Sequence, residues 1–94
     1  MTDAAERRTE PRSLFTVTVK YAFYKSAHLV YQTDLGLTTD MSRTGLGLYT
    51  NRAIDVGESL KLYSKRLSDK PVEAQVKWCA RVSESLFRVG LSFA

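Results

Sequence analysis

The sequence holds few of the residues that build covalent or metal-based sites. Cys79 is its only cysteine and His28 its only histidine. A single cysteine excludes a disulfide within the chain and a zinc site built from several cysteines, and a single histidine excludes a multi-histidine metal site. We therefore expect no cofactor and no metal. The spacing of Asp40 from Asp34 and Asp55 does not place two carboxylates in one pocket, so we also expect no enzyme.

Long hydrophobic runs are also lacking. No apolar run approaches the roughly 18 residues that cross a bilayer, and residues 1–6 lack the apolar segment of a signal peptide. These absences predict no membrane insertion and a cytoplasmic location. No segment repeats its apolar residues convincingly at helical spacing, which argues against a helical domain.

The composition and charge are those of a small basic globular domain. Of the 94 residues, 44% are apolar and 26% are charged, with a formal net charge of +4. This excess favours an anionic partner such as a nucleotide, a nucleic acid or an acidic protein surface. Three arginines, Arg7, Arg8 and Arg12, lie close together in the polar leading segment. They are either a solvated basic start or part of a binding site.

Alternating apolar and polar residues predict strands from Leu14 onward. Short strands separated by turn residues favour an all-β domain, either a closed barrel or a sandwich, preceded by an arm over residues 1–12. This domain is expected over residues 13–94. The predicted strands cover residues 15–23, 28–33, 37–42, 46–50, 59–64, 72–82 and 87–93.

Strand alternation also predicts which side chains face the core. In the segment 37–42, Leu37 and Met41 are expected to face inward, with Thr38, Asp40 and Ser42 facing solvent. In the segment 72–82, the same rule places Trp78 in the core, together with Val72, Ala74, Val76, Ala80 and Val82, and points Cys79 outward between Lys77 and Arg81.

Two local patterns carry groups that suit a guanine nucleotide. The first is R-x-x-x-R, from Arg8 to Arg12, and the second is Asp-Met-Ser-Arg-Thr-Gly over residues 40–45. Arginine can bond to O6 and N7 of guanine, and a carboxylate can accept from its N–H groups. A structural alternative stays open, in which Asp40 and Ser42 cap a turn that ends at Gly45 and the arginines are solvated.

Both patterns, in this order on a six-stranded pattern, resemble the signature of PilZ domains over nearly the whole chain. Residues 6–12 are similar to the family's arginine-rich leading segment, and residues 40–45 to its D/N-x-S-x-x-G segment. Residues 45–48 and 88–93 also resemble family positions, although Thr44 stands where many members have glycine. The resemblance implies a small six-stranded antiparallel β-barrel of the split type, with a flexible N-terminal arm rich in arginine.

The resemblance further implies a receptor for the bacterial second messenger cyclic di-GMP. Carried over by position, Arg8 and Arg12 would bind guanine edges and phosphate, Asp40 and Ser42 would contact guanine, and Gly45 would shape the turn. Occupancy would be signalled to an unidentified protein partner in the control of motility, exopolysaccharide or biofilm.

Arg7 is a further ligand contact by the same resemblance. An arginine directly before the R-x-x-x-R segment is similar to the case of PilZ domains that take up two stacked cyclic di-GMP molecules. The resemblance therefore implies two ligands per chain.

Two other functions remain as alternatives. One is a PilZ-like adaptor that acts through protein contacts without a ligand, against which the intact motif residues argue. The other is a small basic barrel that binds single-stranded nucleic acid, which requires exposed aromatics along a basic groove. Alternation makes nucleic acid an unlikely partner, because it sends most aromatics inward: Phe15, Tyr21, Phe23, Trp78, Phe87 and Phe93.

Overall fold

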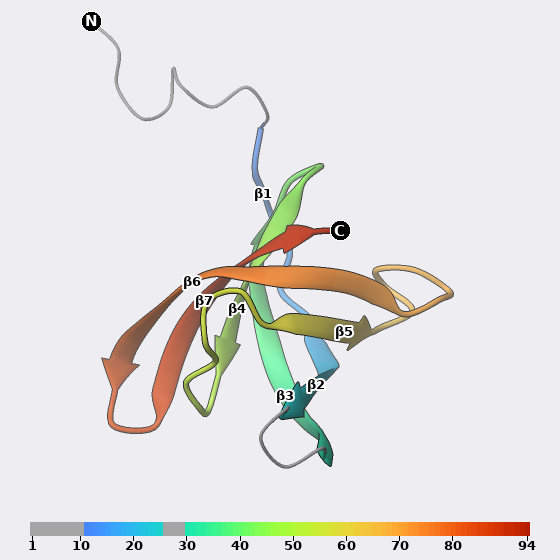
Figure 1. Cartoon of the computed structure of the whole chain (residues 1–94). Helices are drawn as coiled ribbons and strands as arrows, with labels where there is room; N and C mark the ends of the chain where they lie inside the picture. Colours follow the sequence, from blue (N-terminus) through green and yellow to red (C-terminus); the bar gives the residue numbers. More distant parts are fainter. Residues whose placement is uncertain (1–10, 26–29) are drawn as a thin grey trace, which may run out of the picture.

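A computed structural model of the chain describes residues 11–25 and 30–94, and the structural statements below concern these residues (Figure 1). They form seven strands and no helix. The strands are β1 (Ser13–Leu14), β2 (Thr18–Lys25), β3 (Val30–Met41), β4 (Gly45–Thr50), β5 (Ser59–Tyr63), β6 (Val72–Ser83) and β7 (Leu86–Phe93). In the described part of the chain no helix is long and apolar enough to cross a membrane.

Six of these strands close into an antiparallel barrel. The hydrogen-bonded order is β3-β2-β5-β6-β7-β4, and pairing between β3 and β4 joins the two ends. The short β1 adds to the same edge of β3 that β2 uses, opposite residues 40 and 41. In Figure 1, β1 runs beside the β3–β4 hairpin, and the last strand ends near the same place. The expected all-β, six-stranded barrel is confirmed, with β1 as an extra strand.

The barrel interior is filled by aliphatic side chains and two aromatic rings. Tyr21 and Phe23 lie in β2 with their ring centroids 6.0 Å apart. The Tyr21 hydroxyl is buried without a hydrogen-bond partner among the described residues. Burial raises the pKa of Tyr21 to about 12, with a further contribution from Asp34. The remaining buried cluster is Val19, Leu46, Leu48, Ile54, Leu60, Leu62, Ala74, Val76, Val89 and Leu91.

Two predicted strand boundaries were wrong. Residues 28–33 and 37–42 were expected to form separate strands, but β3 runs unbroken from Val30 to Met41 because its pairing with β2 continues through Leu35 and Gly36. The first predicted strand is instead interrupted between β1 and β2. There Thr38 supplies the missing partners, since its Oγ1 accepts from the Val17 N–H at 2.8 Å and donates to the Phe15 carbonyl.

The facing predicted for the second half of β3 was partly wrong. Thr38 is fully buried and Leu37 is 41% exposed, the reverse of the expectation. The hydroxyl of Thr38 is drawn inward by the backbone groups it satisfies, and an extra residue between Thr38 and Met41 then lets Met41 also pack on the core. Ser42 was expected to face solvent but is 8% exposed.

A second bulge overturns the facing predicted for β6. Val76 pairs with Leu91 and Trp78 with the next residue, Gly90, so β6 carries one extra residue there. An extra residue exchanges the two faces of the strand beyond it. As a result Trp78 is 46% exposed rather than buried, and Cys79 packs against the core rather than facing outward. Ala80 and Val82, expected inside, are exposed.

Candidate functional site

The candidate site lies on the outer face of the barrel, over a stretch of sheet without side chains. Gly47 of β4 and Gly90 of β7 are directly opposite each other in the ladder. A Cβ at Gly47 would lie 2.7 Å from Oδ1 of Asp40, and one at Gly90 would lie 2.2 Å from Nε1 of Trp78. The two glycines therefore form the floor of the site. Because they have no side chains, the carboxylate of Asp40 and the indole ring of Trp78 can lie directly on their backbone.

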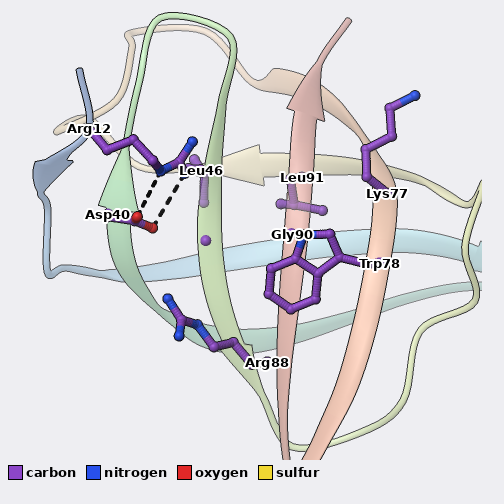
Figure 2. Close-up of a pocket in the computed structure, with 9 residues that line it drawn as sticks. Arg12, Asp40, Leu46, Lys77, Trp78, Arg88, Gly90 and Leu91 are labelled. Carbon is purple, nitrogen blue, oxygen red and sulfur yellow. Dashed lines mark hydrogen bonds and ion pairs between the residues drawn. The ribbon is translucent and has the colours of Figure 1, made fainter. Parts of the chain in front are cut away.

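Trp78 covers one side of this floor. The bulge after Val76 turns its side chain outward, and the indole lies across Gly90 of the neighbouring strand (Figure 2). With 46% of the residue exposed, the ring presents a large aromatic surface to the cavity. An exposed tryptophan in a hollow can stack on a planar group such as a nucleobase.

On the other side, the residue just before β1 joins two residues of the β3–β4 hairpin. Arg12 Nε donates to Oδ2 of Asp40 at 2.7 Å, and Nη2 donates to Oδ1 at 3.4 Å. Nη1 donates to Oγ of Ser42 at 3.3 Å. The structure thus brings Arg12, Asp40 and Ser42 together across 28 to 30 residues of chain.

This ion pair is accessible to solvent, since the side chains of Arg12 and Asp40 are 28% and 25% exposed. The hydrogen bond from Arg12 is the main reason that the pKa of Asp40 lies below its ordinary value of 3.8. Burial opposes this shift, while the hydroxyl of Thr39, at 3.0 Å from Oδ1, and the charge of Arg88 add to it. Asp40 is therefore an anion that can accept N–H donors at neutral pH.

Two further cations complete the lining of the cavity. Arg88 extends from β7 across β4, and Lys77 is the residue between Val76 and Trp78 at the bulge of β6 (Figure 2). The cavity has a volume of about 340 Å³ and is lined by Arg12, Asp40, Leu46, Gly47, Lys77, Trp78, Arg88, Gly90 and Leu91. Its lining carries three cationic side chains against one carboxylate, so it suits an anion that also has an aromatic surface.

Gly45 shapes the hairpin, although not through an unusual backbone angle. A Cβ there would lie 2.1 Å from the Leu91 carbonyl oxygen, so only glycine lets β4 approach β7 this closely. The turn before it is closed by a hydrogen bond from the Ser42 N–H to the Gly45 carbonyl, at 2.8 Å, and Oγ of Ser42 accepts from the Thr44 N–H at 3.3 Å. The side chain of Ser42 therefore stabilises the turn and also binds Arg12.

Of the six predicted site residues, Arg12, Asp40, Ser42 and Gly45 lie together. Arg7 and Arg8 fall outside the described residues. Sequence reasoning missed Trp78, because strict alternation put it in the core, and it gave no ligand role to Lys77 or Arg88. Gly90, which lies opposite Trp78 in the ladder, was the available signal, since a glycine in a strand often marks a close approach or a bulge. No group of three or more metal-ligating side chains occurs in the described part of the chain.

Comparisons with known proteins agree on the fold. The family model of the PilZ domain matches residues 6–94. The structure of the Bacillus subtilis inhibitor of motility MotI/DgrA superposes with a TM-score of 0.68 at 17% identity, covering 94% of this chain and 43% of that chain. The MrkH–c-di-GMP complex of K. pneumonia gives a TM-score of 0.69 at 17% identity, covering 94% and 44%. This chain thus spans less than half of either structure, and no curated protein matches its sequence.

Proposed function

This chain belongs to the PilZ domain family, and from that premise we propose that it is a non-catalytic receptor that binds cyclic di-GMP on the outer face of its barrel. One observation carries the proposal. Arg12 is held by Asp40 and Ser42 at the rim of a hollow that also contains an exposed tryptophan and two more cations. These are the groups that a guanine nucleotide requires.

Each part of cyclic di-GMP has a partner of suitable chemistry in this site. A guanine base offers N–H donors to the carboxylate of Asp40, and its O6 and N7 can accept from a guanidinium. Trp78 can stack on the base face, a contribution of ~1–3 kcal/mol per base at comparable sites. Lys77 and Arg88 stand where they can neutralise the two phosphodiester groups.

The pairing between Arg12 and Asp40 explains how an open site stays ready for the ligand. Both groups are already aligned by their mutual hydrogen bonds, so little side-chain entropy is lost when guanine is bound. The ligand must replace one of those bonds, because the carboxylate has a limited number of acceptor positions. Binding therefore exchanges an intramolecular ion pair for contacts with the nucleotide.

Arg7 and Arg8 complete the proposed site from the leading segment. Arg8 is proposed to share guanine and phosphate contacts with Arg12. One nucleotide offers too few edges and faces to occupy three arginines fully, so we propose that Arg7 allows a second, stacked cyclic di-GMP. A stoichiometry of two that falls toward one in Arg7→Leu is the expected result, and a wild-type stoichiometry of one would refute this point.

Occupancy is proposed to be communicated to a protein partner. A bound nucleotide changes both the charge and the shape of this barrel face, and a partner that binds one state better shifts the equilibrium between them. The same proposal includes the pathway of that partner, which is the control of motility, exopolysaccharide or biofilm.

The exposure of Trp78 gives a second candidate some support. A solvent-exposed aromatic beside Lys77 and Arg88 is what a barrel that binds single-stranded nucleic acid would present. The bounded cavity favours a compact nucleotide over a long strand. Binding of a random single-stranded oligonucleotide, measured beside binding of cyclic di-GMP, distinguishes the two functions.

Titration calorimetry with cyclic di-GMP tests the proposal directly. We expect saturable heat that is not displaced by the oligonucleotide, and weaker binding of cyclic di-AMP. Asp40→Ala should reduce the affinity for cyclic di-GMP and narrow the preference over cyclic di-AMP, because adenine lacks the N–H donors that the carboxylate reads. The absence of heat at high ligand concentration would favour the adaptor instead, and an unchanged preference in Asp40→Ala would make Asp40 a structural residue of the turn.

A further inference from the structure

A second hollow lies on the outer face of the barrel and is apolar. Its volume is about 590 Å³, and it is lined by Thr18, Leu35, Gly36, Leu37, Tyr49, Thr50, Asn51 and Leu86. Leu35, Leu37 and Leu86 are 60%, 41% and 37% exposed. Several leucines that remain exposed around one hollow are the usual mark of a surface that another molecule covers. We call this surface the leucine groove.

Two cations lie beside the leucine groove, and the neighbouring carboxylate of Asp34 is paired with Arg52. None of the residues that line the groove is charged. In the ladder, Lys20 stands directly opposite Leu35, and Arg88 directly opposite Tyr49, so each cation shares a face of the sheet with a groove residue. No carboxylate within the described residues forms a salt bridge with Lys20 or Arg88. The complementary surface is therefore apolar with negative charge at its margins.

We propose that the leucine groove docks an apolar segment with acidic flanks from a partner protein, and that cyclic di-GMP weakens this docking through Arg88. The coupling rests on the proposed function, whereas the groove itself does not. A second copy of the chain fits less well, because each copy carries a formal net charge of +4 and would bring Lys20 and Arg88 toward cations of its own kind.

Arg88 connects the two hollows. Its guanidinium lies 5.9 Å from the centroid of the Tyr49 ring, which lines the leucine groove, and its side chain also lines the ligand cavity. A phosphate or guanine bound in the cavity competes for the same guanidinium. Occupancy then removes a positive charge from the margin of the groove and uncovers one face of Tyr49. The affinity for an acidic segment falls, and by linkage the partner reduces the affinity for cyclic di-GMP by the same factor.

The groove can be tested with a defined probe. We would titrate the protein with a synthetic amphipathic peptide of leucine and glutamate, and with its leucine–lysine counterpart, following backbone amide shifts. The leucine–glutamate peptide should shift the amide signals of residues 35–37, 49–51 and 86. Leu35→Ser should lower the affinity for this peptide roughly tenfold. Val56→Ser is the matched control, since Val56 is 66% exposed and lies outside the groove, and it should bind as the wild type does.

Three results would overturn the groove as a docking site. They are the absence of binding, equal binding of the leucine–lysine peptide, and shifts that map elsewhere on the barrel. Concentration-dependent dimerisation through residues 35–37 without peptide would overturn the acidic partner in favour of a second copy. None of these results depends on cyclic di-GMP.

The coupling is measured separately with Tyr49 variants. Saturating cyclic di-GMP should lower the affinity for the leucine–glutamate peptide about fivefold or more, both in the wild type and in Tyr49→Phe, which keeps the aromatic ring. In Tyr49→Leu the peptide affinity is measured with and without cyclic di-GMP, and the ratio of the two affinities should be smaller than in the wild type, because the ring that Arg88 covers is gone. An unchanged peptide affinity when cyclic di-GMP demonstrably binds would overturn the coupling alone. If calorimetry shows no cyclic di-GMP binding, the proposed function and the coupling both fail, and the peptide result still decides the groove.

Discussion

The strands that build the core and the strands that build the site differ in regularity. β2 and β5 pair in an unbroken register from Lys20 opposite Tyr63 to Phe23 opposite Leu60, and they supply buried side chains. β3 and β6 each carry a bulge. Those bulges place Asp40 and Trp78 on the outer face of the barrel. Regular alternation thus produces stability, and a local departure from it produces the site.

The largest expected effect falls on a regular strand. Leu62 of β5 is fully buried, so Leu62→Ala removes packed methyl groups and leaves a cavity. We expect a loss of ~2–5 kcal/mol in the free energy of unfolding, measured by urea denaturation. Val56→Ala, at an exposed residue, is the control and should change stability little. A loss below about 1 kcal/mol in Leu62→Ala would mean that the interior is not packed as described.

Arg12→Ala should affect the site and spare the barrel. Its side chain makes charge-assisted bonds to Asp40 and Ser42 and lies before the first barrel strand. We expect cyclic di-GMP affinity to fall by ~1.5–3 kcal/mol in calorimetry, with an unfolding curve close to that of the wild type. Arg43→Ala alters a neighbouring exposed cation that does not line the cavity, and it is the matched comparison. If folded Arg12→Ala bound cyclic di-GMP with the affinity of the wild type, Arg12 would not be part of the ligand site.

Gly90→Ala tests whether the bare floor is needed. The added methyl group would displace the indole of Trp78, which lies 2.2 Å from the ideal Cβ position. The expected loss of affinity reaches at most the ~1–3 kcal/mol that stacking supplies, together with a change in tryptophan fluorescence. Gly57→Ala is the contrast, because its φ of +94° makes the substitution strained with no side chain nearby. Gly57→Ala should lower the free energy of unfolding and leave the tryptophan fluorescence unchanged. If the tryptophan fluorescence of Gly90→Ala were also that of the wild type, the placement of Trp78 would be contradicted.

The smallest effect concerns pH and sharpens the account of Asp40. Its pKa in the folded protein is lowered by Arg12, so the ion pair is fully formed above 3.8 and is lost as the pH falls through the lowered pKa. A carboxyl carbon titration by NMR should give a midpoint below 3.8 for Asp40. In Arg12→Ala the midpoint should rise, because the largest cause of the shift is gone. A wild-type midpoint at or above 3.8 would mean that the pair does not persist in solution.

The sequence was sufficient for the parts of the fold that follow from local periodicity. Alternation identified β5, β7 and most of β4 and β6, and the absence of helical spacing indicated an all-β domain. It failed where tertiary contacts compete with periodicity. The hydroxyl of Thr38 turned inward to satisfy backbone groups of the segment between β1 and β2, and continuous pairing with β2 carried β3 through Gly36.

The site shows the same division. The residue types of the two motifs indicated a guanine nucleotide, and the structure brought Arg12, Asp40 and Ser42 together as those motifs suggested. Lys77 and Arg88 were missed because nothing along the chain shows that they lie beside the motif residues, and Trp78 was missed because one extra residue in β6 exchanges its two faces. Such a bulge depends on how β6 registers against β7, which no local pattern in β6 reveals.

By itself, therefore, the sequence determined an all-β domain, its positive charge and the chemistry of its two motifs, because these depend on composition and on neighbours along the chain. Only the tertiary structure decided which faces of β3 and β6 are outside, and that a tryptophan and two glycines meet beside the motif residues. The physical reason is that strand register is set by pairing between distant segments. One additional residue in a ladder reverses every side chain that follows it.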